Sequence, residues 1–253
     1  MTTHEGIIGL AIFVCLSTAA ICTLVLYDKL PSRYHHDDTN NVVRLVANIF
    51  VVMTSLVLGL MVNSSKSTFE AVDRNVHAIA TEMILLDRAL RQSGPEADDA
   101  RQRLMAYVKQ ALTGSAPTTD PLVVGDRASE RLLVDVGTSM NAIKPPDTDH
   151  VGSWQEARQH YQKVVELRWV LVEQSEGTIP GPLLAMVVAW LILIFASFGY
   201  RAPRNIVVFG SLILAAGLIA STIYLILDMA TPLDGPIQVS DLPLRRLLVE
   251  LNS

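Results

Sequence analysis

The sequence predicts an all-α integral membrane protein, in which two transmembrane helical hairpins bracket a four-helix extramembrane domain. The first observation is composition: hydrophobic residues make up 50% of the 253 residues, and the mean hydropathy is +0.35. The second is that apolar residues gather in four runs of about 20 residues each, the length with which a helix crosses the hydrocarbon core of a bilayer. The third is that the chain between the second and third runs is amphipathic, with apolar residues at helical spacing.

The first two apolar runs, Gly6–Tyr27 and Val42–Val62, form the predicted first transmembrane hairpin, residues 1–62. No Lys or Arg precedes the first run and no small-residue cleavage site is evident after it, so we expect a retained helix rather than a signal peptide. The polar segment Asp28–Asn41 contains a proline and is expected to be a short loop.

Residues 63–178 are predicted to form the extramembrane bundle. A heptad seam continues the second run without a break, so one long helix should leave the membrane and end at Ser93-Gly94-Pro95; its apolar positions are Phe69, Val72, Val76, Ile79, Met83, Leu86 and Leu90. Three more amphipathic helices are expected over residues 95–112, 127–143 and 153–174. Helices with one apolar stripe each bury those stripes best as an antiparallel bundle.

The last two apolar runs, Pro182–Tyr200 and Asn205–Leu227, form the predicted second transmembrane hairpin, residues 179–228. Proline and glycine just before the third run break the preceding helix, and a turn of four residues joins the two runs. The C-terminal tail, residues 229–253, should hold a short amphipathic helix that Ser240 or Asp241 caps and that lies on the membrane or on the bundle.

Basic residues near the membrane ends give the expected orientation. Lys29 and Arg33 lie in the loop of the first hairpin, and Arg44 lies at the start of the second run. Arg201 and Arg204 lie in the loop of the second hairpin. The positive-inside rule therefore puts both short loops in the cytoplasm, with the helical bundle and both termini outside it.

A family resemblance rests mostly on the C-terminal third of the chain. The segments are FASFGYRAPRN over residues 195–205, ILDMATPLDGPIQVS over residues 226–240, and the Pro-Leu pair at 243–244. Together with the layout of helices, this pattern resembles an uncharacterised bacterial membrane family labelled bestrophin-like, a domain of unknown function. The residues that carry it are Ser197, Arg201, Pro203, Arg204, Asn205, Pro232, Gly235, Ser240 and Pro243, whereas Leu233 stands where many members have Phe.

The resemblance implies a bacterial inner (plasma) membrane location, and by its name it suggests channel activity. True bestrophins are pentameric anion channels in which the second membrane helix lines the pore and continues into a helical domain. The comparable stretch here, residues 58–71, lacks the aromatic pair expected before the acid Glu70. Channel activity is therefore an analogy at the level of the fold.

A polar stripe runs along the second membrane helix at spacings of 4, 7, 4 and 4, through Arg44, Asn48, Ser55, Gly59 and Asn63. These offsets place the five residues on one helix face, and polar groups are costly to expose to lipid. One interpretation is a water-lined ion path that forms when copies of this helix surround an axis. The other is helix–helix packing, in which small residues allow close approach and amides bond across the interface.

Other polar residues carry weaker signals. Asp228 ends the fourth run, where the helix dipole disfavours an acid, so Lys66 or amides near Gly181 are candidate partners; the alternatives are an interfacial structural role or a gating role. The loop His35-His36-Asp37-Asp38 lacks the spacing of a structural zinc site and is interpreted as solvated. The remaining isolated residues are interpreted as helix-surface histidines (His77, His150, His160) and as packing cysteines (Cys15, Cys22).

The net charge of -5 leaves no basic patch for a nucleic-acid partner. No nucleotide loop, nucleophile motif or His-Glu metal pattern is present, so we expect no enzymatic activity and no cofactor or metal. We expect a homo-oligomer in the lipid bilayer that conducts inorganic ions, with the second helix lining the path. The alternative is a sensor or scaffold whose bundle binds a ligand or a partner protein.

Overall fold

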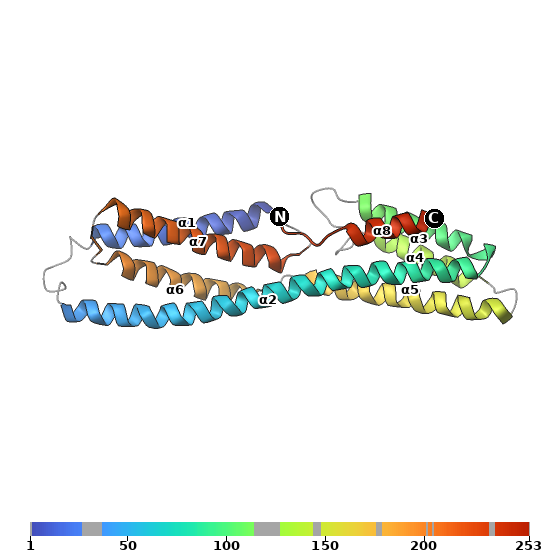
Figure 1. The fold of residues 1–253 in the computed structure, drawn as a ribbon, viewed down its shortest axis with the longest axis horizontal. Helices are drawn as coiled ribbons and strands as arrows, with labels where there is room; N and C mark the ends of the chain where they lie inside the picture. The colour runs from blue at the N-terminus through green and yellow to red at the C-terminus, as the bar shows by residue number, and fades with distance from the viewer. Residues whose placement is uncertain are drawn as a thin grey trace. The chain divides into compact units, whose positions relative to one another are not determined.

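The computed structural model describes residues 2–26, 37–113, 127–143, 148–175, 179–200, 202–203, 205–232 and 236–252 (Figure 1). These residues form helices joined by turns, and no strand occurs among them. Within them, four helices are long and apolar enough to cross a membrane. The predicted all-α membrane fold is therefore confirmed. The chain divides into two compact units, Met1–Ser67 with Thr178–Ala230, and Thr68–Gly177 with Thr231–Ser253.

The first unit contains the candidate membrane spans. α1 (Thr2–Leu26) packs against both α6 (Gly181–Gly199) and α7 (Ile206–Ala230), and Figure 1 shows the three helices side by side. Their core includes Leu16, Val187, Leu191, Phe195, Ala216 and Ile223. A Cβ atom at Gly199 would collide with the carbonyl of Ala20 and with Oγ1 of Thr23, so glycine is what permits α6 to approach α1 at this point.

The first half of α2 (Asp37–Gln92) joins this unit along one side of the helix. Met61 belongs to the buried core, and the ring of Phe50 lies 6.4 Å from that of Trp190 on α6, centroid to centroid. Ala47 and Thr54 are buried on the same side. Because 3.6 residues make a turn, these residues define an inner face of α2, and the opposite side of the helix faces away from the first unit.

The second unit is a helical bundle built by the rest of α2 with α3 (Asp98–Thr113), α4 (Arg127–Ala142), α5 (Thr148–Ser175) and α8 (Leu242–Asn252). α2 is one helix of 56 residues, the single long helix that the sequence predicts. The core side chains of the bundle include Val72, Met83 and Leu86 from α2, Leu104 and Val108 from α3, Val136 from α4, and Val164 and Leu171 from α5.

Two details refine the expected bundle. Of the two expected positions of the tail helix, α8 takes the one on the bundle, and it buries Leu244, Leu247 and Leu251 in the core as a fifth helix among the described residues. α5 begins at Thr148 rather than at Ser153. The end of α2 is as predicted: Gly94 has φ 90°, a left-handed conformation that favours glycine, and it leads into the short 3-10 helix η3 (Pro95–Ala97).

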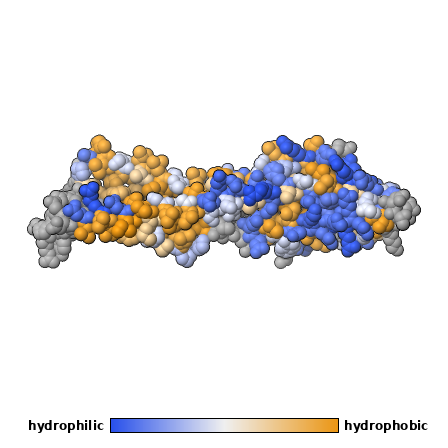
Figure 2. Space-filling view, turned by 60° about the horizontal axis from the view of Figure 1, so that its bottom comes forward, coloured by the Kyte–Doolittle hydropathy of each residue, from blue (hydrophilic) through white to orange (hydrophobic). Residues whose placement is uncertain are grey.

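The surface follows the same division. In the space-filling view, hydrophobic surface predominates over the helices of the first unit and hydrophilic surface over the second (Figure 2). Exposed large apolar side chains are numerous on the membrane helices, with Ile7, Leu10, Leu45, Leu56, Ile206 and Leu214 among them. Such a surface is expected of helices that face lipid or other membrane helices.

Candidate functional site

The polar stripe lies on the outward side of α2. Arg44, Asn48, Ser55, Gly59 and Asn63 are all exposed. At about 100° per residue, the first four fall within roughly 60° of one another and Asn63 lies about 40° further round. The stripe is thus brought together as the sequence predicts, and the other membrane helices of the same chain do not cover it.

The outward side of α2 also carries an apolar sector next to the stripe. Its exposed side chains are Leu45, Ile49, Met53, Leu56 and Leu60. The apolar sector adjoins the stripe and overlaps its edge, because Leu45 lies at the same helix angle as Asn63. Two further exposed apolar residues, Val52 and Val62, fall among the stripe residues. The outward side of α2 is therefore mixed, with its polar residues gathered toward one edge.

The hydrogen bonds of the stripe are incomplete within the chain. Ser55 Oγ donates to the carbonyl of Val51 on its own helix at 2.8 Å. In the part of the chain that the structure describes, no hydrogen bond engages the side-chain amide of Asn48 or Asn63. An unsatisfied amide is costly in hydrocarbon, so these groups require water or another molecule.

Sequence analysis missed a second polar feature of α2, on its inner face. Thr54 and Ser65 are buried, and their hydroxyl oxygens find no hydrogen-bond partner in the described segments. They are 11 residues apart, which is close to three helical turns and places them on one side of the helix. This spacing is the signal that could have distinguished them from the outward stripe.

The two charged candidates near the ends of the spans occupy different environments. Lys66 is exposed on α2, whereas Asp228 is fully buried in α7 at 0% exposure. Each makes at least one polar interaction. Asp228 lies two residues before the end of α7 at Ala230, so its carboxylate is enclosed by protein rather than held in the open interface.

The family-pattern residues that the structure describes form turns and helix starts. Asn205 Oδ1 accepts the backbone N–H of Val208 at 2.8 Å, a cap at the start of α7. Ser240 Oγ accepts the N–H of Leu242 at 3.3 Å at the start of α8. The others are Ser197, which bonds to its own helix, exposed Pro203, and buried Pro232 and Pro243. Arg201, Arg204 and Gly235 lie outside the described residues.

One histidine differs from the prediction. His160 Nδ1 lies 2.6 Å from Glu82 Oε2, and the ring is largely buried between α5 and α2. The interpretation of His160 as a helix-surface residue is therefore wrong, because its partner lies 78 residues away and leaves no local signature. His35 and His36 lie outside the described residues. Among the described residues, no group of three or more His, Cys, Asp or Glu could hold a metal ion.

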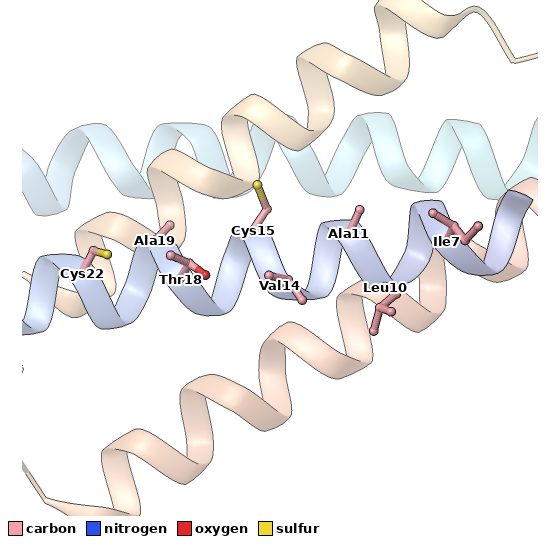
Figure 3. Close-up of a pocket in the computed structure, with 8 residues that line it drawn as sticks. All are labelled: Ile7, Leu10, Ala11, Val14, Cys15, Thr18, Ala19 and Cys22. Atoms are coloured by element: carbon pink, nitrogen blue, oxygen red, sulfur yellow. The ribbon is translucent and has the colours of Figure 1, made fainter.

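Two apolar grooves mark the outer surface of the membrane helices. One follows α1, and its lining residues all belong to that helix: Ile7, Leu10, Ala11, Val14, Cys15, Thr18, Ala19 and Cys22 (Figure 3). Both cysteines are free and exposed there, and no disulfide joins them. The other lies between the start of α2 and the end of α6, with Phe50 and Tyr200 among its lining residues.

Comparison with known proteins gives one match. The family model described as Bestrophin-like domain matches residues 14–244, from within α1 to the first turn of α8. No curated protein and no solved structure matches. The matched region contains the whole polar stripe and most of both units.

Proposed function

Because this chain belongs to the bestrophin-like family, we propose that it is an oligomeric ion-conducting membrane protein in which α2 lines the path. Copies of α2 surround a common axis, with the polar stripe turned toward it. The path carries small inorganic ions, and Arg44 at the start of the stripe favours anions. The protein acts by conduction, with no catalytic step and no cofactor.

The observation that supports this proposal is the outward position of the stripe. Among the described residues, the side-chain amides of Asn48 and Asn63 have no hydrogen-bond partner, and both lie on the outward side of a largely apolar span. Lipid cannot satisfy those groups, whereas water in a shared path can. The adjoining apolar sector then packs on neighbouring copies or faces lipid.

The length of the stripe fits a path through the bilayer. From Arg44 to Asn63 the helix rises about 28 Å at 1.5 Å per residue. The hydrocarbon core of a bilayer is about 30 Å thick. Polar groups are thus available at intervals through most of the membrane depth, as conduction of hydrated ions requires.

The alternative function is a membrane sensor or scaffold. The feature that favours it is the continuity of α2, which passes from the span into the bundle as one helix of 56 residues. A ligand or partner protein bound to the bundle could shift such a helix. A closed ring of several copies in purified material supports the path, and a monomer or dimer supports the sensor.

We further propose a bacterial inner-membrane location, with the bundle and both termini outside the cytoplasm. The proposal rests on the positive-inside rule and on Lys29, Arg33, Arg201 and Arg204, whose positions fall outside the described residues. A reporter enzyme that is active only outside the cytoplasm, fused after Ser253, should be active. Activity of a reporter that works only inside would reverse the orientation.

Ion flux through liposomes tests the main proposal. Wild-type protein should give selective flux, and Asn48→Leu and Ser55→Leu should reduce it or alter its selectivity while the protein stays folded and oligomeric. Leu56→Ile, in the neighbouring apolar sector, is the matched control and should leave flux unchanged. Flux no higher than that of empty liposomes, across several ions and pH values, would assign the stripe to packing.

A further inference from the structure

The bundle of the second unit buries an arginine in its apolar core. Arg168 on α5 is only 7% exposed. It lies between Val164 and Leu171, both fully buried at 0%, at spacings of four and three residues along the core-facing side of the helix. Its position is therefore one at which the helical pattern calls for an apolar side chain.

Within the described ranges, no hydrogen bond or ion pair engages the guanidinium of Arg168, and its Nε is enclosed by protein without a hydrogen-bond partner. The terminal Nη atoms are not among the enclosed, unpartnered atoms, and 7% of the residue's surface is exposed. An anion would contact the guanidinium through this exposed part.

The polar groups that join α5 to α2 are already engaged with one another. Oε2 of Glu82 lies 2.6 Å from Nδ1 of His160, and Oε1 of Glu82 lies 3.5 Å from Nζ of Lys163. On the other side of Arg168 along α5, Gln174 accepts a hydrogen bond from Asn75 at 2.7 Å. Glu82, Asn75 and Gln174 are thus engaged elsewhere, and no ion pair joins Arg168 to an acid in the described part of the chain.

The residues that follow Arg168 reverse the usual pattern of a bundle helix. Trp169 is 58% exposed and Val170 is 37% exposed, so the charge points inward and the apolar side chains point outward. Natural sequences depart from local consistency mainly at functional sites. The reversal is confined to this stretch, because the other exposed side chains that the structure describes on α5 are polar.

A buried guanidinium without a countercharge is unfavourable, because arginine stays protonated at any physiological pH and cannot neutralise itself. A bound anion would remove that penalty, and the planar fork of arginine binds oxyanions and halides well. We propose that Arg168 is the binding residue of a small inorganic anion in the second unit. This site is separate from the path along α2 and does not depend on ion conduction.

The test is binding to the full-length protein, purified in detergent with gluconate as the bulky anion. Chloride, and separately sulfate, replaces gluconate at constant ionic strength while thermal unfolding is followed. The wild-type midpoint should rise and saturate with at least one of them, since ligand bound to the folded state stabilises it. A response to chloride alone identifies a halide site, and a response to sulfate identifies an oxyanion site.

Variants assign the response to the residue. Arg168→Met should lose the saturable rise and, in gluconate alone, should unfold at a higher temperature than wild type, because the uncompensated charge is gone. Arg88→Met makes the same change at an exposed position of α2 and should keep the full response. Arg168→Lys keeps the charge without the planar fork and should respond more weakly to the anion. This second variant serves as the test if Arg168→Met does not fold.

Three results would overturn the proposal. The first is a wild-type midpoint that does not depend on the anion at constant ionic strength. The second is an Arg168→Met or Arg168→Lys variant that keeps the full response. The third is loss of the oligomer in Arg168→Met without any anion dependence in wild type, which would make a carboxylate of a second copy the partner of the guanidinium.

Discussion

Asp87 holds Arg91 in place one turn along α2: Nε of Arg91 donates to Oδ2 of Asp87 at 2.7 Å. The other carboxylate oxygen, Oδ1, accepts a hydrogen bond from Nε of Arg101 on α3 at 2.9 Å. Arg91 in turn donates through Nη2 to the carbonyls of Glu250 and Leu251, at 3.2 and 3.3 Å. A single buried carboxylate, 4% exposed, thus connects α2, α3 and the C-terminal end of α8.

Replacement of Asp87 by Asn should destabilise the second unit by on the order of 2 kcal/mol, because two guanidinium groups lose their shared countercharge. α8 should also detach more readily, since Arg91 would no longer be held toward its last carbonyls. Thermal unfolding and limited proteolysis at the C-terminus measure the two effects.

Asp99→Asn is the control for that change. Asp99 pairs with Arg103 at 2.8 Å, but both side chains are largely exposed. Exposed pairs contribute about 0 to 1 kcal/mol, so this variant should stay close to wild type. Equal effects of the two substitutions would mean that the buried network does not stabilise the bundle.

A side chain at Gly137 on α4 should be unfavourable while Tyr161 is present. A Cβ atom there would collide with the phenol oxygen and ring of Tyr161, which donates to the carbonyl of Leu133 at 3.1 Å. Gly137→Ala should therefore destabilise the protein by about 1 to 3 kcal/mol, the cost of overpacking. In a Tyr161→Leu background the same change should become neutral or stabilising, because alanine favours helix.

The control for Gly137 is Gly152 on α5, where nothing lies within 4 Å of an added Cβ atom. Gly152→Ala should stabilise by up to about 1 kcal/mol through helix propensity alone. Thermal unfolding of the four variants forms a double-mutant cycle with this control. An additive cycle would contradict the contact between Gly137 and Tyr161.

Tyr161 should ionise late, because burial raises the pKa of its phenol above the usual 10.0. The folded form then holds its proton more tightly than the unfolded form. The associated stability is present below about pH 10 and is lost as the pH rises through the pKa of the folded protein. In an alkaline titration followed by tyrosinate absorbance, one tyrosine should ionise at a higher pH than an exposed tyrosine, and Tyr161→Phe should remove that step. A high-pH step that persists in Tyr161→Phe would contradict its assignment to Tyr161.

Much of the fold follows from local sequence signals. Long apolar runs predict the bounds of the spans α1, α6 and α7 to within a few residues, and Gly94 with Pro95 predicts the end of α2. These features depend on side chains that are neighbours along the chain. Hydrophobic length and backbone conformation are local properties, so a single sequence is enough to predict them.

Long-range partners do not leave such signals. The same amphipathic face of α8 could lie on a membrane or in the bundle, and only the structure places Leu244 and Leu247 in the core. His160 finds Glu82 on a distant part of the chain. Arg168 falls on the apolar spacing of α5, but a charged residue is typical of a helix surface, and its burial depends on the packing of other helices.

Thiol accessibility separates the two sectors of α2 one residue apart. With Cys15 and Cys22 changed to Ser, a cysteine at position 55 would lie in the polar stripe and one at position 56 in the apolar sector, about 100° round the helix. If α2 lines a water-filled path, a charged thiol reagent should modify Ser55→Cys in membranes and leave Leu56→Cys unmodified. A thiol in lipid does not ionise, and charged reagents do not enter hydrocarbon.

The same pair of variants gives a functional measurement. Modification at position 55 should reduce flux through liposomes in proportion to the label incorporated, since the added charge and volume lie in the path. A membrane-permeant neutral reagent should label both variants and so establishes that each cysteine is present and reactive. Equal labelling of both by the charged reagent, or labelling of neither, would contradict a water-lined stripe and favour helix packing at Ser55.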